Sequence, residues 1–367
     1  MNILMILPYL KAGGTERQAS YIANYLLNKG YQTDIISIEN EPAFEDLFDN
    51  SVIYLNSKNS LSYLIKNIFL IIYKVKNCEA DVIISRAWNS NFISIIVSLI
   101  TRKPVVVFLS GSIDLSGSNF IKRYIQSFLI NKATKIISVS ERSKNNCMKW
   151  LNVPEEKIKV IYNGVDAHLL NKLSKQIFDI PEELNQESLK IVFVGRLIHR
   201  KGLDVLLNAF AKVIRNRKNI SLIIIGSGPE KENYQQQADE LGISSKVHFL
   251  GEKSNPFPYI NYGDIFVMPS RSEGFPNVLL EAMALKKTVI ASDCETGPNE
   301  IINNQNGILI PVDDPIALAE TIENLLNSSK LINEYAENAY QTVINNFMLN
   351  DQLKILENEL IKLIRSN

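Results

Sequence analysis

The sequence predicts an α/β protein, because short apolar runs of strand length alternate with amphipathic segments of helical period along the chain. This alternation begins twice, once at residue 2 and again near residue 190. A glycine-bearing loop follows the first apolar run, and Gly30 ends the predicted helix over 16–28. The expected strands of the first half are 2–7, 33–38, 81–85, 104–109, 135–139 and 158–162. We therefore expect a doubly wound parallel sheet in this half.

The second half repeats the pattern after a polar segment over 171–187, which contains Pro181 and is the predicted linker. Helices are expected over 203–215, 230–241 and 278–285, and strands over 191–194, 222–225, 247–250, 265–268, 288–291 and 308–310. The predicted domains are residues 1–170 and 188–345, and a helix over 346–367 is expected to return to the first domain. The architecture that follows is two Rossmann-like domains facing each other across a cleft.

The composition, with 46% hydrophobic and 21% charged residues, is typical of a soluble globular protein. No apolar run approaches the roughly 18 residues that span a bilayer, and the first ten residues lack the pattern of a signal peptide, so we expect a cytoplasmic protein. Cys78, Cys147 and Cys294 are odd in number and widely separated, which favours buried thiols in a reducing compartment. The three histidines are scattered, so no metal site is expected.

The neutral total hides an asymmetry of charge. Residues 1–170 hold 19 basic and 14 acidic side chains, which leaves 20 and 25 for the rest, so the halves carry +5 and −5. The excess lies in two segments without acidic residues, 50–78 and 115–140, whose helical apolar stripes are Leu61, Leu64, Ile65, Ile68 and Ile72, and Phe120, Ile121, Tyr124, Ile125 and Phe128. The stripes either pack on a sheet or rest on an anionic membrane surface, which attracts apolar and basic residues together.

Each half begins with a strand and a loop suited to phosphate. In the first, Gly13 and Gly14 let the backbone approach an anion closely. In the second, Arg196 offers a planar fork for phosphate oxygens and Lys201 a point charge five residues later, while Arg200 is expected to be a solvated residue. Thr15 and Gln18 have the spacing of a helix capping box.

The segment 272–283 places two carboxylates on either side of a loop-to-helix junction. Glu273 precedes the helix, Pro276 is expected at its first position, and Glu281 lies more than one turn inside. Backbone amides around Gly274, Phe275 and Asn277 would face a phosphate, and the carboxylates would accept hydrogen bonds from sugar and ribose hydroxyls. The alternative is that Glu273 is a turn residue and Glu281 a surface helix residue.

Several function classes lack their signatures. The GGTERQ segment has no third glycine in register for a dinucleotide, and the sequence contains no GxxxxGK[ST] loop and no serine-hydrolase elbow. A nucleic-acid-binding module needs a strongly basic stripe, which a neutral chain does not favour.

Taken together, GGTER, NGVD at 163–166, GRLIHRKG at 195–202 and the Glu273–Glu281 pair resemble the retaining family 4 glycosyltransferases of GT-B fold over nearly the whole chain. The resemblance implies an acceptor-side first domain and a donor-binding second domain. It also implies that Arg196 and Lys201 bind the donor diphosphate, that Glu281 holds the ribose, that Glu273 lies beside the transferred sugar, and that Gly14 adds backbone amides. The TGPNEI segment at 296–301 is similar to bacterial enzymes that use UDP-linked N-acetylhexosamines.

This chain departs from the family where many relatives have a histidine near the donor sugar, because it reads Ser110-Gly111-Ser112 there. Arg86, Asn89, Ser110 and Asp114 are the candidates for the sugar or acceptor side. Lys286 and Lys287, where relatives usually have glycine and proline, are interpreted as surface drift.

The resemblance implies transfer of a sugar from a UDP-linked donor to a hydroxyl of a glycan or lipid-linked acceptor, with retention and without a metal. Two rivals remain open: a UDP-N-acetylglucosamine 2-epimerase, which the histidine-poor first half disfavours, and a non-catalytic nucleotide-sugar sensor. The family favours same-face transfer, although Glu273 as a nucleophile is a second route.

Overall fold

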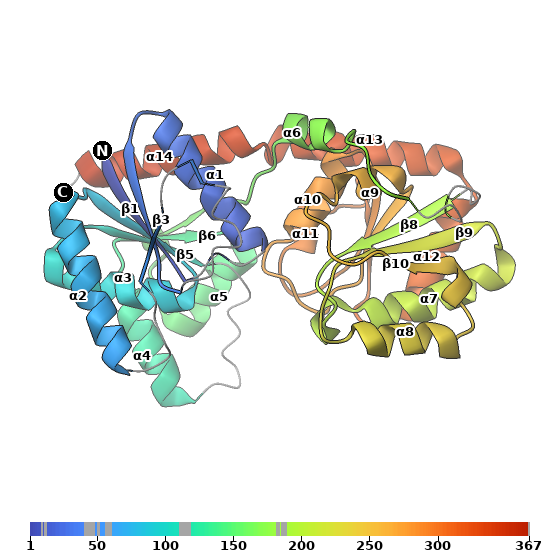
Figure 1. Ribbon diagram of the computed structural model, residues 1–367, viewed down its shortest axis with the longest axis horizontal. Coiled ribbons are helices and arrows are strands. Elements are labelled where there is room, and N and C mark those ends of the chain that lie inside the picture. The colour runs from blue at the N-terminus through green and yellow to red at the C-terminus, as the bar shows by residue number, and fades with distance from the viewer. Residues whose placement is uncertain are drawn as a thin grey trace. The chain divides into compact units, whose positions relative to one another are not determined.

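The computed structural model describes residues 1–8, 10, 13–39, 48–49, 52–55, 61–109, 119–180, 184 and 189–365. The chain divides into two compact units, unit 1 with residues 1–163 and 350–367, and unit 2 with residues 164–349 (Figure 1). Each unit is a parallel sheet with helices, so the predicted α/β class with two Rossmann-like domains is confirmed. The domain limits predicted at residues 170 and 346 stay predictions.

Unit 1 contains a parallel sheet in the order β3-β2-β1-β4-β5-β6-β7. The order reverses between β1 and β4, which is the mark of a doubly wound sheet. The strands are β1 (Asn2–Leu7), β2 (Gln32–Ser37), β3 (Val52–Tyr54), β4 (Val82–Arg86), β5 (Val105–Leu109), β6 (Lys135–Ser138) and β7 (Ile158–Val160). The helices are α1 (Gly14–Asn28), α2 (Leu61–Asn77), α3 (Trp88–Thr101), α4 (Phe120–Ile130) and α5 (Glu141–Leu151).

Unit 2 contains a parallel sheet in the order β10-β9-β8-β11-β12-β13, which reverses between β8 and β11. Its strands are β8 (Leu189–Val194), β9 (Ile220–Ile225), β10 (Val247–Phe249), β11 (Ile265–Met268), β12 (Thr288–Ser292) and β13 (Ile308–Ile310). Its helices are α6 (Ala167–Leu173), α7 (Leu203–Asn216), α8 (Lys231–Glu240), α9 (Phe257–Tyr262), α10 (Asn277–Ala284), α11 (Pro298–Ile301), α12 (Pro315–Leu326) and α13 (Ser329–Asn346). Ligands of such sheets bind beyond the carboxyl ends of the strands at the reversal.

The last helix, α14 (Leu349–Arg365), packs on unit 1. The Glu357 carboxylate accepts hydrogen bonds from the hydroxyls of Tyr25, at 2.8 Å, and Tyr31, at 2.7 Å. Burial and this carboxylate raise the pKa of Tyr25 to about 12. Leu356 and Leu360 are buried on the same helix, so apolar packing and two charge-assisted hydrogen bonds hold α14 in place.

Two predicted helix starts are wrong. Gly13, in extended conformation, is the N-cap of α1 and provides no side-chain cap, so Thr15 lies inside the first turn and the capping box with Gln18 does not exist. A glycine is an acceptable N-cap, which lets the helix begin earlier. In α10, Pro276 is the extended N-cap and Asn277 the first helical residue. No described helix combines the length and apolar content needed to cross a membrane.

Candidate functional site

The site begins where the loops after β8 and β11 meet, at the reversal of strand order in unit 2. Lys201 Nζ donates a hydrogen bond to Glu273 Oε1 at 2.5 Å. The two side chains are only 17% and 8% exposed, so little solvent screens this ion pair. The sequence predicts that both residues belong to one donor site, and the structure brings them together although 72 positions separate them in the chain.

The loop after β8 is held against β11 by close backbone packing. Gly202 has φ +67°, and a Cβ there would lie 1.9 Å from the carbonyl oxygen of Pro269, so only glycine fits. The Arg271 guanidinium donates to both carboxylate oxygens of Asp204, at 2.9 and 2.6 Å, and to the carbonyl oxygen of His199. Burial raises the pKa of Asp204, but the Arg271 hydrogen bonds and charge outweigh it and lower that pKa overall. This clamp fixes the turn that carries Lys201.

Two further arginines belong to the same loop after β8. Arg196 is exposed, and its guanidinium makes no hydrogen bond or ion pair with the described residues, so it is available to an anion. Arg200 Nη1 donates to the carbonyl oxygen of Ser272 at 2.8 Å and lies 3.8 Å from a Glu273 oxygen. The predicted solvent exposure of Arg200 is confirmed, since its side chain is 50% exposed, and the same side chain is also anchored to the loop after β11.

The backbone of Glu273 is held from its other side by the loop after β12. Thr296 Oγ1 donates to the carbonyl oxygen of Glu273. Gly297 has φ +93°, and a Cβ there would lie 2.6 Å from Pro276 Cδ, so the turn packs directly on the start of α10. Burial and the charge of Glu273 raise the pKa of the Cys294 thiol to about 11. The sequence marks 296–301 only by its similarity to other enzymes. The local pattern that predicts this turn is Gly297 directly before a proline.

The residues around α10 are mostly buried. Glu281 is 8% exposed on α10, which excludes the alternative of a surface helix residue. Phe275 is 7% exposed and its ring centroid lies 5.9 Å from that of Phe347, so the turn from Gly274 to Asn277 is fixed by packing. Lys287 is not surface drift, because its Nζ donates to the carbonyl oxygens of α9 residue Asn261 and of Gly263, at 2.8 and 3.1 Å.

In unit 1, Gly13 and Gly14 follow β1 and Arg86 is the last residue of β4, the two strands between which the strand order reverses. Gly13 and Gly14 begin α1. Arg86, at the end of β4, is 1% exposed, with its guanidinium 4.6 Å from the Phe108 ring centroid, and its Nε and Nη2 have no hydrogen-bond partner among the described residues. Burial lowers the pKa of Arg86 to about 10, against the opposing charge of Glu16. Arg86 is thus a buried group rather than an exposed contact.

Asn89 is exposed in the first turn of α3. Ser110 and Asp114 lie outside the described residues, so their predicted part in sugar or acceptor binding stays a prediction. Within the described part of the chain, no three His, Cys, Asp or Glu side chains gather in a way that could hold a metal ion. The unit 2 site therefore consists of cationic side chains, a helix start and two carboxylates, a set suited to a polyanion that also carries hydroxyl groups.

The chain matches two family models in sequence order: Glycosyltransferase Family 4 over residues 12–169 and Glycosyl transferases group 1 over residues 174–342. It is 29% identical over 319 residues, 82% of each chain, to the N,N'-diacetylbacillosaminyl-diphospho-undecaprenol alpha-1,3-N-acetylgalactosaminyltransferase of Campylobacter jejuni. It is 27% identical over 288 residues, 75% of each chain, to the capsular polysaccharide biosynthesis glycosyltransferase CapM of Staphylococcus aureus.

The crystal structure of Anabaena HepE in complex with UDP superposes with a TM-score of 0.86 at 22% identity, over 99% of this chain and 100% of that one. This similarity extends over both units, each of which has the parallel α/β sheet expected of a GT-B domain. The chain belongs to the glycosyltransferases of group 1, with the GT-B fold.

Proposed function

We propose that the enzyme transfers a sugar, an N-acetylhexosamine or a hexose, from a UDP-sugar to a hydroxyl of a glycan or lipid-linked acceptor in the synthesis of a cell-surface polysaccharide or glycan. The observation that carries the proposal is the Lys201–Glu273 pair at the strand reversal of unit 2. Arg196, whose guanidinium makes no bond with the described residues, lies in the same loop as Lys201. The relatives named as capsular and diphospho-undecaprenol glycosyltransferases, and the neighbour that holds UDP, support this substrate class.

The roles of the residues follow from their charge and placement. Arg196 and Lys201 bind the diphosphate, with the backbone amides of Gly274, Phe275 and Asn277 as further donors. Glu281 accepts the ribose hydroxyls. Glu273 lies beside the transferred sugar, and the diphosphate competes with its carboxylate for Lys201, so donor binding releases Glu273 toward sugar hydroxyls.

The chemistry is group transfer with retention at the anomeric carbon. The bond from that carbon to the diphosphate breaks, the acceptor oxygen bonds to the same face, and the acceptor proton moves to a phosphate oxygen of the departing UDP. Arg196 and Lys201 lower the barrier because negative charge accumulates on the diphosphate in the transition state. These cations supply the charge that a divalent metal would otherwise provide, so the reaction proceeds without a metal.

The test incubates the protein with a panel of nucleotide sugars and membrane extract, with and without EDTA, followed by mass spectrometry and NMR of the products. We expect a new glycosidic bond of the donor's anomeric configuration, formed equally in EDTA. Release of a free epimer would identify an isomerase, and tight UDP-sugar binding without turnover a sensor. Loss of activity in EDTA would refute the metal-independent mechanism alone.

We also propose that unit 1 contacts an anionic membrane surface. The predicted α4 stripe does not pack on the sheet: Phe120, Ile121, Tyr124, Ile125 and Phe128 are 49–76% exposed. On α2, Ile68 and Ile72 of the predicted stripe pack against the core instead, and the exposed apolar residues are Phe69 and Tyr73, at 67% and 62%. Neither helix contains an acidic residue. We expect the protein to co-sediment with phosphatidylglycerol vesicles but not with phosphatidylcholine vesicles. Binding to neither kind of vesicle would refute the proposal, and equal binding to both would refute its electrostatic part.

A further inference from the structure

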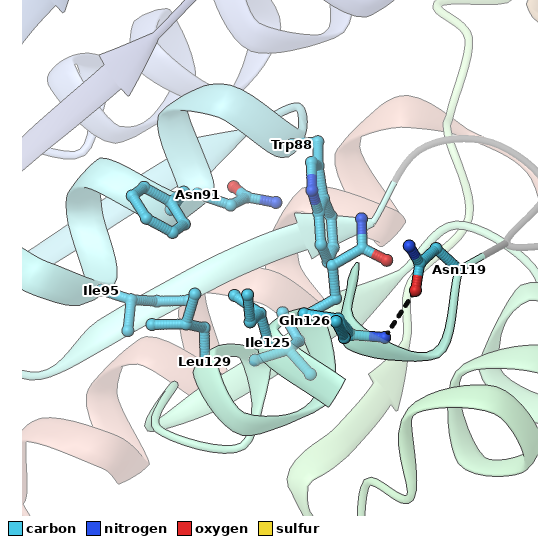
Figure 2. Close-up of a pocket in the computed structure, with 10 residues that line it drawn as sticks. Trp88, Asn91, Ile95, Asn119, Ile125, Gln126 and Leu129 are labelled. Carbon is cyan, nitrogen blue, oxygen red and sulfur yellow. Dashed lines mark hydrogen bonds between the residues drawn. The ribbon is translucent and has the colours of Figure 1, made fainter. Parts of the chain in front are cut away.

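A pocket of about 420 Å³ lies between α3 and α4 in unit 1 (Figure 2). Its volume is within the range of small-molecule sites, about 300–1,000 Å³. The floor is formed by core side chains, including Ile95 and Ile130, which are 2% and 1% exposed. The rim is formed by Trp88, Ile121 and Ile125, which are 37–64% exposed. The pocket therefore leads from the exposed apolar stripe of α4 into the interior.

The lining contains three side-chain amides, those of Asn91, Asn119 and Gln126. The Asn91 amide is engaged, because it accepts from the Ser85 hydroxyl at 2.7 Å and donates to the carbonyl oxygen of Phe108 at 2.9 Å. Asn119 Oδ1 accepts from the backbone N–H of Ile121 at 3.0 Å. Gln126 Oε1 is buried without a hydrogen-bond donor among the described residues. Because two of the three amides are engaged, the lining offers few of the convergent hydrogen-bonding groups that a sugar or a peptide needs, and its apolar remainder suits a hydrocarbon chain.

The two helices that enclose the pocket contain no acidic residue. Arg123 lies near the start of α4, with its guanidinium 5.3 Å from the Trp150 ring centroid. Arg102 and Lys132 follow the ends of α3 and α4, next to the amino ends of β5 and β6. Through Asn91 the pocket also adjoins the ends of β4 and β5, the carboxyl edge of the unit 1 sheet. A chain that enters over the start of α4 would thus place its head near the edge where ligands of parallel sheets bind.

We propose that this pocket holds one segment of the hydrocarbon chain of a lipid phosphate or diphosphate, the lipid part of the acceptor. The proposal rests on the proposed function and names its acceptor class. The chain enters over Ile121 and Ile125, lies against Trp88, and ends at Ile95 and Ile130. Its phosphate stays outside the apolar lining.

Trp88 provides a direct probe, because the sequence contains only two tryptophans and Trp150→Phe leaves Trp88 alone. Monomeric 12-bromododecyl phosphate, below its micelle concentration, is expected to quench Trp88 fluorescence saturably. Unbrominated dodecyl phosphate should reverse the quenching by competition. Each CH2 removed from the chain should weaken binding roughly three- to fourfold, the equivalent of about 0.8 kcal/mol per buried CH2.

The variant pair is Ile125→Glu, which places a carboxylate on the rim, and Phe128→Glu, the same change at 54% exposure on the same helix but outside the lining. Ile125→Glu should weaken dodecyl phosphate at least about tenfold, and Phe128→Glu less than about twofold. Ile121→Glu, 64% exposed and also on the rim, repeats the test if Ile125→Glu folds poorly.

Equal effects of the rim and control variants, or absence of saturable quenching, would overturn the proposal. Quenching by vesicles of brominated phosphatidylglycerol but not by the monomer would also overturn it, since the helix face would then touch bulk lipid without taking a single chain. Absence of glycosyl transfer by the wild type in membrane extract, with intact quenching, would refute the transferase proposal and leave the pocket standing.

Discussion

The Lys201–Glu273 ion pair allows a quantitative prediction. At an effective dielectric constant of about 20, unit charges 2.5 Å apart attract by about 7 kcal/mol, and desolvation of the two groups offsets most of that. Removing one partner of a buried pair costs about 3–5 kcal/mol. Because Lys201 keeps 17% exposure and Arg200 lies 3.8 Å from Glu273, we expect Lys201→Met to lower the free energy of unfolding by about 2–3 kcal/mol.

A double-mutant cycle tests the reasoning by urea denaturation. Adding Glu273→Gln to Lys201→Met should restore at least about 1 kcal/mol, because the unpaired buried carboxylate is removed. The control is Lys286→Met, whose 2.7 Å pair with Glu337 is 53% and 49% exposed, so that its loss should destabilise the protein far less than Lys201→Met. Strict additivity in the cycle, or equal effects of Lys201→Met and Lys286→Met, would refute the argument.

Three further predictions test the donor site and the packing. Arg196→Ala should reduce UDP-sugar turnover at least about tenfold, about 1.4 kcal/mol, with unfolding unchanged, because the exposed guanidinium makes no bond with described residues; unchanged turnover would remove it from the site. Gly202→Ala should lower the melting temperature and weaken UDP binding measured by calorimetry, since its Cβ would lie 1.9 Å from the Pro269 oxygen; a wild-type melting curve would contradict the packing. Hydrogen bonds from Tyr31 and Tyr25 lower the pKa of Glu357, so its stabilisation should be full above the unfolded value of about 4.3 and decline as pH falls through the lower folded value. Glu357→Gln should therefore be less stable than wild type at pH 7, and the difference should narrow as the pH falls below about 4.3. A difference independent of pH would exclude the carboxylate as its source.

Local pattern predicted much of each unit, because strands and helices of a parallel α/β sheet carry strong apolar periodicity. Most strands lie within a residue or two of their predicted ends, and β3, only three residues long, was missed. Helix starts were less accurate at Thr15 and Pro276, where a glycine and a proline took the N-cap instead. Boundaries depend on a few hydrogen bonds, which periodicity does not report.

The sequence by itself determined the alternation of strands and helices, the residue types of the site and the neutral but divided charge. Lys201 and Glu273 were recognisable because cations and carboxylates at loop-to-helix junctions are typical of phosphate and sugar binding. Only the tertiary structure decided that these two pair directly, that Arg200 and Thr296 hold the same loop, and that the α4 stripe stays exposed beside an apolar pocket. Such features depend on which strand ends become neighbours and on which helix faces the sheet leaves uncovered, and both are set by long-range packing rather than by local sequence.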